Sequence, residues 1–188
     1  MSRGRTLWMA TGNPHKHREA RIVLMEYGLD LRRLEVKRIE IQADDLEEIA
    51  AYSVEHIPEA DSRPIVVEDA GLFIHHLKGF PGPYSSYALK TIGLRGILKL
   101  MEGVQNREAT FKSVVALRWR GETHLFKGEV QGRIATEIRG SQGFGYDPIF
   151  IPDEGDGRTF GEMTTREKNK LSHRARAFRR LALWLTSS

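Results

Sequence analysis

The first apolar run of the chain, residues 7–10, has the length and composition of a short buried strand. Asn13 and Pro14 follow it, and asparagine at an N-cap with proline at the first helical position favours a helix start. The apolar residues after this start have the spacing i, i+3, i+4, i+7 of one buried helix face: Ala20, Val23, Leu24 and Tyr27. Gly28 is well placed to end this helix.

The next segments alternate between strand and helix patterns. We expect a second strand over residues 34–41 and a helix over residues 46–56. A β-branched run entered from a proline predicts a buried strand at residues 65–67 that stops at residues 68–71. An ordered loop follows at residues 79–84, where prolines and glycines exclude regular structure.

The second half of the chain continues this alternation. Residues 91–102 have a helical pattern, and residues 110–119 and 124–134 predict two strands joined by a short turn. Thr164 and Glu167 match a capping box that opens a C-terminal helical region. Five apolar residues line one face of that region: Leu171, Ala175, Phe178, Ala182 and Leu185. Helices before, between and after strands predict an α/β domain with a mixed sheet.

Composition excludes several classes of protein. The 188 residues contain no internal repeat or long linker, so we expect one domain over residues 1–188. The absence of cysteine excludes disulfides, thiolate zinc sites and cysteine nucleophiles. No segment resembles a signal peptide or a membrane span, so we expect a cytoplasmic protein with no membrane partner.

The charge of the chain favours an anionic partner. The formal net charge is +4 and the sequence pI is near 9.4. Residues 166–180 contain seven Lys or Arg against one acid, whereas residues 40–48 are acidic. Nucleic acid and small phosphorylated substrates both fit this balance.

The first candidate site joins the first strand to the first helix, over Thr11, Gly12, Asn13, Pro14, His15 and Lys16. Free backbone N–H groups and the helix dipole favour an anion at such a position. Gly12 would let a phosphate approach the backbone, and Lys16 adds a positive charge. The alternative is a well-capped helix with a surface lysine. The segment is not a Walker A loop, since the chain has no Gly-Lys-Ser/Thr.

The second candidate site is Glu68, Asp69, Ala70 and Gly71, at the predicted end of a buried strand. Ligands of α/β domains usually bind at this edge of the sheet. Two adjacent acids can hold Mg²⁺ and orient or deprotonate a water molecule. The alternative is a solvated turn with two acids.

The third candidate site lies in residues 143–148, where two aromatic residues separated by glycine precede an acid. Such a segment could stack a base and bind its edge, or could be a glycine-rich turn with core aromatics. The fourth is the basic run at residues 167–174, which offers positive charge for phosphates. Its alternative is the solvated face of an amphipathic helix.

Together, these segments resemble the inosine triphosphate pyrophosphatase family, also called the non-standard purine NTP pyrophosphatases. The resemblance extends from about Leu7 to about Phe178. Five motifs carry it: Thr11-Gly12-Asn13, Glu68-Asp69-x-Gly71-Leu72, Gly79-x-Pro81-Gly82-x-Tyr84-Ser85, Gly143-Phe144-Gly145-Tyr146-Asp147 and Ser172-His173-Arg174.

The resemblance implies a fold, a reaction and partners. The fold would be α/β, with a mixed, strongly twisted central sheet flanked by helices and two lobes with a nucleotide cleft between them. The enzyme would use Mg²⁺, with Mn²⁺ possible, to hydrolyse deaminated purine nucleotides (ITP, dITP, XTP) to the monophosphate and pyrophosphate. It would be a homodimer that requires no nucleic acid.

The resemblance also implies roles for individual residues. Residues 11–16 would bind the triphosphate, Asp69 would be the general base and a metal ligand, and Glu40 the other metal ligand. The remaining substrate contacts would come from Ala70, Phe144, Gly145, Tyr146, Asp147, Lys168, His173 and Arg174. Ala70 departs from the serine of many members, and Ser86 stands where many have lysine.

Base choice would follow from hydrogen-bond patterns. A 6-oxopurine presents an N1–H donor and an O6 acceptor, which Asp147 and Arg174 match, whereas adenine reverses both.

Two other functions remain open at this point. One is a pyrophosphatase for pyrimidine triphosphates, and the other is a nucleic-acid-binding module that uses the basic run at residues 166–180.

Overall fold

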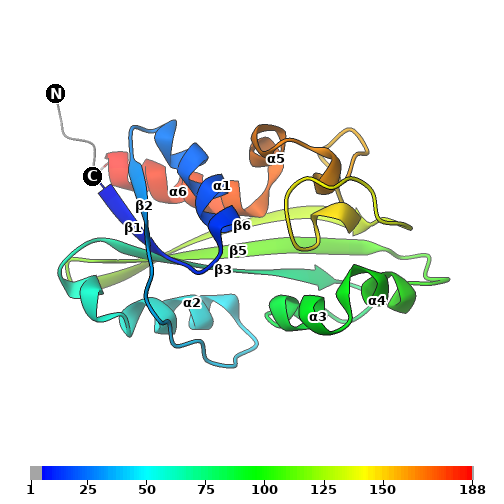
Figure 1. Cartoon of the computed structure of the whole chain (residues 1–188), viewed down its shortest axis with the longest axis horizontal. Helices are drawn as coiled ribbons and strands as arrows, with labels where there is room; N and C mark the ends of the chain where they lie inside the picture. The colour runs from blue at the N-terminus through cyan, green and yellow to red at the C-terminus, as the bar shows by residue number, and fades with distance from the viewer. Residues whose placement is uncertain (1–5, 188) are drawn as a thin grey trace. The chain divides into compact units, whose positions relative to one another are not determined.

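The computed structural model describes residues 6–187, which form a mixed α/β fold as the sequence predicts (Figure 1). In these residues seven strands make one sheet of order β2-β1-β3-β5-β6-β7, with β4 paired to β3. The strands are β1 Thr6–Ala10, β2 Asp30–Leu34, β3 Ile65–Ile74, β4 Pro81–Gly82, β5 Glu108–Trp119, β6 Glu122–Ile134 and β7 Phe150–Pro152. Strand β1 is parallel to β2 and β3, whereas β4 pairs antiparallel with β3 and β7 with β6.

Six α-helices accompany the sheet in the described residues. They are α1 Pro14–Met25, α2 Leu46–Glu55, α3 Ser85–Thr91, α4 Gly93–Leu100, α5 Thr165–Leu171 and α6 His173–Ser187. Short 3₁₀ turns cover Pro58–Asp61, Asp147–Ile149 and Phe160–Glu162. None of the helices in residues 6–187 is both long and apolar enough to cross a membrane.

The chain divides into two compact units. Unit 1 consists of Met1–Asp69, Ser113–Gly128 and Arg174–Ser188, and unit 2 consists of Ala70–Lys112 and Glu129–His173. The long strands β3, β5 and β6 each contribute residues to both units. Each unit has its own cluster of buried apolar side chains.

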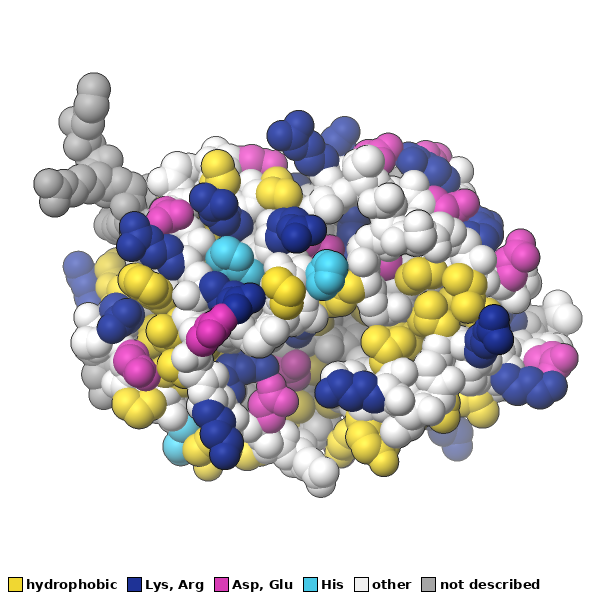
Figure 2. All heavy atoms as spheres, viewed as in Figure 1, with side chains coloured by type: hydrophobic (Ala, Val, Ile, Leu, Met, Phe, Trp, Pro, Cys, Tyr) yellow, Lys and Arg dark blue, Asp and Glu magenta, His cyan; other side chains and the backbone are white. Residues whose placement is uncertain are grey.

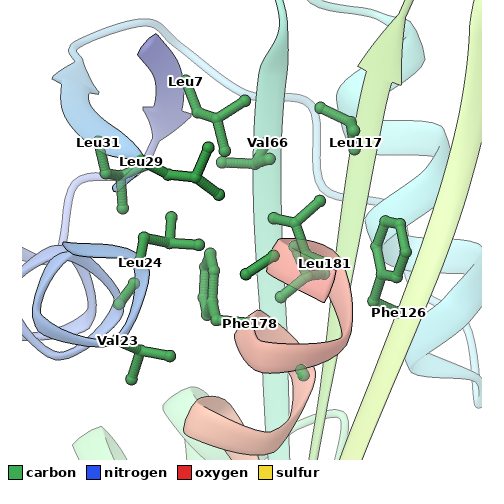
Figure 3. Close-up of a cluster of buried hydrophobic side chains, with 14 of the residues drawn as sticks. Leu7, Val23, Leu24, Leu29, Leu31, Val66, Leu117, Phe126, Phe178 and Leu181 are labelled. Atoms are coloured by element: carbon green, nitrogen blue, oxygen red, sulfur yellow. The ribbon is translucent and has the colours of Figure 1, made fainter. Parts of the chain in front are cut away.

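The core of unit 1 forms where α1 and α6 pack on the sheet (Figure 3). Val23 and Leu24 of α1 meet Phe178 and Leu181 of α6, and Val66 of β3 lies in the same cluster. The N-terminus of α1 is capped as expected, because the Asn13 side chain accepts hydrogen bonds from the next helical N–H groups. Burial of these two helical faces therefore holds the second half of α1 against the sheet.

The core of unit 2 is rich in aromatic side chains. Phe111, Phe150 and Phe160 form a contiguous group, in which the rings of Phe111 and Phe150 meet edge to face with centroids 4.7 Å apart. Leu72 and Ile74, from the second half of β3, are buried in the same cluster. Such aromatic pairs contribute about 0.5–1.5 kcal/mol each beyond their area burial.

Strand β3 is longer than the sequence predicted. The expected end at residues 68–71 is wrong, because β3 continues to Ile74 and places Glu68 and Asp69 in its middle. Leu72 is buried and pairs with β4, so the strand has both a core and a partner beyond the acids. Gly71 permits this pairing, since a Cβ there would lie 2.3 Å from the carbonyl oxygen of Gly82.

Two other predictions about strands are also wrong. The strand expected at residues 34–41 is β2 at Asp30–Leu34, because parallel pairing with β1 uses these residues and none of residues 35–41 is buried. The loop at residues 79–84 contains the short strand β4. The helix expected at residues 91–102 is confirmed as α4 with small shifts of its ends, whereas α3 at Ser85–Thr91 was not predicted.

The C-terminal helical region consists of two helices, so the prediction that its five apolar residues line one face is wrong. The predicted capping box of Thr164 and Glu167 is present and opens α5, and Ser172 separates α5 from α6. Leu171 consequently packs with the core of unit 2, whereas the other four predicted apolar residues lie in the core of unit 1. The helix at residues 46–56 and the hairpin of β5 and β6 are confirmed, with small shifts of their ends.

Truncation of Phe178 tests the unit 1 core. Phe178 is fully buried, so Phe178→Ala should lower the free energy of unfolding by about 3–5 kcal/mol. Leu183 lies on the same helix and is 53% exposed, so Leu183→Ala should change the free energy of unfolding by no more than roughly 0.5 kcal/mol. Urea denaturation followed by circular dichroism measures both. Equal losses in the two variants would contradict the packing described here.

Candidate functional site

The loop before α1 is closed by its own side chains. The Asn13 Oδ1 atom accepts the N–H groups of His15 at 2.9 Å and Lys16 at 3.3 Å, and Thr11 Oγ1 accepts the N–H group of Asn13 at 3.0 Å. The expectation of free N–H groups at this helix start is therefore wrong for Asn13, His15 and Lys16, because the side chains of Thr11 and Asn13 already accept them. An anion bound here must displace these bonds or rely on the Lys16 charge.

Gly12 differs from most glycines of the chain. Its φ is not positive, and a Cβ built on it would meet nothing within 4 Å. Neither backbone strain nor internal packing therefore requires glycine at this position. An open approach to the loop backbone is what contact with a phosphate needs.

A buried group of polar side chains, the Glu68 cluster, lies in unit 1 and consists of Lys16, Glu19, Glu68, Ser113 and Arg174. Glu68 Oε1 accepts hydrogen bonds from Ser113 Oγ at 2.8 Å and from Arg174 Nε at 3.1 Å. Glu68 Oε2 lies 2.9 Å from Lys16 Nζ. Arg174 Nη1 in turn donates to Glu19 Oε2 at 2.6 Å. The contacts join the starts of α1 and α6 to strands β3 and β5.

Glu68 is ionised despite its burial. Burial in a low-dielectric site acts to raise the pKa of its carboxyl group. The positive charges of Arg174 and Lys16 and the hydrogen bonds from Lys16 and Ser113 outweigh burial and hold the pKa well below its usual range. The sequence interpretation offered Glu68, together with Asp69, as a possible Mg²⁺ ligand, whereas the family resemblance gave it no role. An acid directly after the buried run at residues 65–67 was the available signal.

The two carboxylates expected to bind metal lie in different surroundings within unit 1. Asp69 is half-buried in β3, directly after Glu68. Glu40 lies in residues 35–45, which have no regular structure, and its side chain is 60% exposed and paired with Arg38. In the described part of the chain no three His, Asp or Glu side chains gather as a metal cage. A metal held by these two carboxylates must complete its shell with water or substrate oxygens, as Mg²⁺ commonly does.

In unit 2 the predicted base-binding segment is held by Asp147. Asp147 is buried, and its Oδ2 atom accepts the backbone N–H of Phe144 at 2.8 Å and lies 2.7 Å from Lys168 Nζ. Lys168 Nζ also lies 4.9 Å from the centroid of the Phe144 ring. Gly143 permits this arrangement, since its φ is 72° and a Cβ there would lie 2.1 Å from Asp147 Oδ2. The structure thus brings Phe144, Asp147 and Lys168 together.

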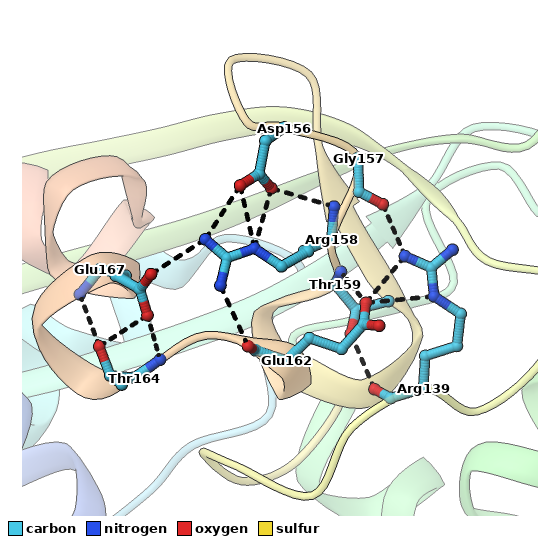
Figure 4. A network of polar contacts seen from close by, with 8 residues as sticks. All are labelled: Arg139, Asp156, Gly157, Arg158, Thr159, Glu162, Thr164 and Glu167. Carbon is cyan, nitrogen blue, oxygen red and sulfur yellow. Dashed lines mark hydrogen bonds and ion pairs between the residues drawn. The ribbon is translucent and has the colours of Figure 1, made fainter.

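Helix α5, which carries Lys168, is held at its start by a network of ion pairs (Figure 4). Arg158 pairs with Asp156 at 2.9 Å and with Glu167 of the capping box at 3.0 Å. Arg139 pairs with Glu162 at 2.8 Å in the turn that precedes the helix. These contacts order the segment that presents Lys168 to Asp147.

Two further predicted residues have packing roles in unit 2. Tyr146 is buried, and its hydroxyl donates to the carbonyl oxygen of Ser85 at 2.8 Å. Burial raises the pKa of Tyr146 to about 12, so this phenol stays protonated at neutral pH. The His173 ring is buried and stacks on Phe111 with centroids 4.4 Å apart.

The predicted site residues divide between the two units. Residues 11–16, Glu40, Asp69 and Arg174 belong to unit 1, and residues 70, 144–147, 168 and 173 belong to unit 2. Asp147 and Arg174, the expected base-reading pair, each have a buried partner of opposite charge within their own unit. Their contact with a base stays a prediction, as do the other substrate contacts.

Comparison with known proteins places this arrangement in a family. The sequence model of the Ham1 family matches residues 7–184. A protein of Thermococcus kodakarensis named dITP/XTP pyrophosphatase is 55% identical over 179 residues, which cover 95% of this chain and 96% of that protein. A protein of the same name from Hyperthermus butylicus is 52% identical over 181 residues, which cover 96% of this chain and 95% of that protein.

Solved structures agree with the sequence comparisons. The structure of a HAM1 protein from Coxiella burnetii superposes with a TM-score of 0.85 at 29% identity, covering 98% of this chain and all of that one. The Staphylococcus aureus Ham1 protein superposes with a TM-score of 0.81 at 26% identity, covering 97% of this chain and 99% of that one. The mixed α/β fold is thus shared over nearly the whole chain.

Two glycines of the Phe144 segment offer a matched test of the Asp147 contacts. Gly143 and Gly145 both have positive φ, so alanine at either should destabilise the fold by about 1–2 kcal/mol through backbone strain. Gly143→Ala should lower the free energy of unfolding by about 3 kcal/mol more, because the new Cβ displaces Asp147 from buried Lys168. Nothing lies within 4 Å of a Cβ at Gly145. Urea titration of both variants measures the difference, and its absence would refute this role of Gly143.

Proposed function

The chain belongs to the Ham1 family, and from this premise we propose that it hydrolyses ITP, dITP and XTP to the monophosphate and pyrophosphate. The observation that carries the proposal is 52–55% identity, over nearly all of both chains, to relatives named dITP/XTP pyrophosphatase. The family model extends through both units, so we further propose that residues 1–188 act as a single domain of this type.

Unit 1 supplies the phosphate-binding residues in this proposal. The open backbone at Gly12 and the ammonium group of Lys16 lie at the start of α1, where the helix dipole also favours an anion. Thr11 and Asn13 lie in the same loop, and Pro14 and His15 begin α1. Ala70, the first residue of unit 2, follows Asp69 in β3 and contributes backbone rather than a hydroxyl contact.

Glu40 and Asp69 are the proposed ligands of Mg²⁺, or of Mn²⁺ in its place. Both side chains offer the hard oxygen donors that these cations prefer, and two carboxylates leave coordination positions for phosphate oxygens and water. A bound divalent cation supplies charge neutralisation to the phosphates and makes pyrophosphate a better leaving group.

Asp69 is the proposed general base. Its carboxylate would accept a proton from the water as the water oxygen bonds to the α-phosphorus. The bond from that phosphorus to the oxygen that bridges to the β-phosphate breaks, and pyrophosphate leaves. The neighbouring carboxylate of Glu68 is engaged by Lys16, Ser113 and Arg174, so it is poorly suited to the same task. The half-buried Asp69 is the better candidate of the two acids.

Unit 2 supplies the residues proposed to hold the base and sugar. Phe144 offers an aromatic face for purine stacking, with Gly145, Tyr146 and Asp147 shaping its loop. Lys168 contributes a positive charge, and His173 precedes Arg174 at the start of α6. Recognition of the N1–H and O6 edge of a 6-oxopurine by Asp147 and Arg174, helped by backbone N–H groups, remains part of the proposal.

The structure favours this proposal over a nucleic-acid-binding module. Lys168 and Arg174, two of the seven basic residues in 166–180, are buried in ion pairs. The run is therefore not a continuous solvated basic face. On the face seen in Figure 2, Lys and Arg side chains are interspersed with acidic and hydrophobic ones. A homodimer, a cytoplasmic location and independence of nucleic acid stay predictions.

The products of ITP hydrolysis test the reaction. Incubation with ITP and Mg²⁺ should release IMP and pyrophosphate in one step, because the proposed attack separates the α- and β-phosphates. Ion-exchange chromatography of the nucleotides, with parallel assays for pyrophosphate and orthophosphate, measures this. IDP and orthophosphate as first products would exclude the mechanism. A panel that includes XTP, ATP, GTP and dUTP separates purine from pyrimidine specificity.

Replacement of Asp69 tests the general base. Asp69→Asn keeps the shape of the side chain but removes a proton acceptor and a metal charge, so kcat should fall at least about 10²- to 10⁴-fold. ITP binding, measured by calorimetry, should largely survive. The exposed Asp153, paired with Arg133, provides the matched control Asp153→Asn, which should turn over normally. Near-normal turnover in Asp69→Asn would remove this residue from the mechanism.

A further inference from the structure

The charged members of the Glu68 cluster form a chain of alternating formal charge. Its order is Lys16, Glu68, Arg174 and Glu19, with each neighbouring pair in direct contact. Glu68, Arg174 and Glu19 are buried, whereas 18% of the Lys16 side chain is exposed. Lys16 is therefore the end of the chain that a ligand from solvent can meet.

The two oxygens of Glu68 have different partners. Oε1 is fixed by Ser113 and by Arg174, whose guanidinium is itself held by Glu19. Oε2 faces the Lys16 ammonium. A carboxylate clamped through one oxygen gives the other a defined position, so Lys16 meets a fixed partner rather than a mobile one.

The same contacts place Lys16 beside the proposed catalytic residue. Lys16 Nζ also donates to the backbone carbonyl of Glu68 at 3.4 Å, one residue before Asp69. An unrestrained lysine on an open loop samples many rotamers and loses that entropy when it binds a ligand. Here the ammonium is already held against β3 at the level of Asp69.

We propose that Glu68 is a positioning residue that holds the Lys16 ammonium in the place where the triphosphate reacts. The proposal rests on the function proposed above only in that Lys16 contacts the phosphates. Glu68 touches no reacting atom and acts through Lys16. Loss of such alignment, even by about 1 Å, can lower a rate about 10²-fold.

A spectroscopic measurement tests the positioning without any activity. A lysine ammonium held in an ion pair gives a slowly exchanging ¹H–¹⁵N signal, and Lys16→Met assigns the signal that belongs to Lys16. This signal should be present in the wild type, lost in Glu68→Gln and retained in Glu47→Gln. Glu47 is the matched control, because it pairs with Lys127 in the same unit and has no part in the proposed site. A Lys16 signal that is absent from the wild type or unchanged in Glu68→Gln overturns the proposal.

Kinetics of ITP hydrolysis test the consequence for catalysis. In Glu68→Gln we expect kcat to fall about 10²-fold with KM changed only a few-fold, because the charge of Lys16 remains but its alignment is lost. The double variant Lys16→Met/Glu68→Gln should be no slower than Lys16→Met alone, since Glu68 acts through Lys16. An unchanged kcat in Glu68→Gln, or a further loss in the double variant, contradicts this role.

Glu68→Gln also removes a charged partner of buried Arg174, so a second variant is needed to separate loss of positioning from loss of folding. Glu68→Asp keeps the charge but is one methylene shorter, so it cannot reach Ser113, Arg174 and Lys16 together. It should show the same selective fall in kcat, at a smaller size, with a normal thermal melting curve. Wild-type kinetics in Glu68→Asp overturn the proposal. If the wild type does not hydrolyse ITP, the proposed function fails, whereas the spectroscopic test of Lys16 still stands.

Discussion

The structure of unit 1 depends on one constraint, which is that an ionised carboxylate cannot be buried without partners. The effective penalty for burying an ion is several kcal/mol, and it is offset only by opposite charges and hydrogen bonds of good geometry. Glu68 meets this condition with Lys16 from α1, Ser113 from β5 and Arg174 from α6. These residues are 52, 45 and 106 positions from Glu68 along the chain. The carboxylate therefore specifies how the starts of both helices sit on the strand that carries Asp69.

The same rule orders unit 2 with the charges reversed. Lys168 is buried, and Asp147 supplies its counter-charge at 2.7 Å. Because Asp147 also accepts the N–H of Phe144, the pair fixes the loop that presents the aromatic ring. Gly143 is needed for steric reasons, since any side chain there would occupy the place of the Asp147 carboxylate. In both units a buried ion pair thus holds a segment that the family resemblance assigns to the nucleotide.

The local part of this architecture could be predicted from the sequence, and the non-local part could not. Asn13 and the capping box at Thr164 act within a few residues, so their patterns indicate helix starts directly. The extent of β3 depends instead on a partner strand at Pro81–Gly82 and on a second core, neither of which periodicity in residues 65–74 reveals. The contacts of Glu68 with Lys16, Ser113 and Arg174 are a tertiary property as well. The sequence therefore offered Glu68 only as an acid beside Asp69 that could hold Mg²⁺, and the resemblance assigned Arg174 to the base.

The alternating charges have a consequence for how a triphosphate is recognised. Lys16, Glu68, Arg174 and Glu19 carry formal charges that sum to zero, so the cluster exerts little long-range attraction on a polyanion. In the proposed function its effect is confined to short range, where the fixed Lys16 ammonium would meet a phosphate oxygen in one geometry. The net charge of +4 over the whole chain can raise the encounter rate, but it cannot distinguish one triphosphate from another. In the proposed function, selectivity must therefore arise from residues that touch the base, while the Glu68 cluster would serve the alignment that all triphosphates share.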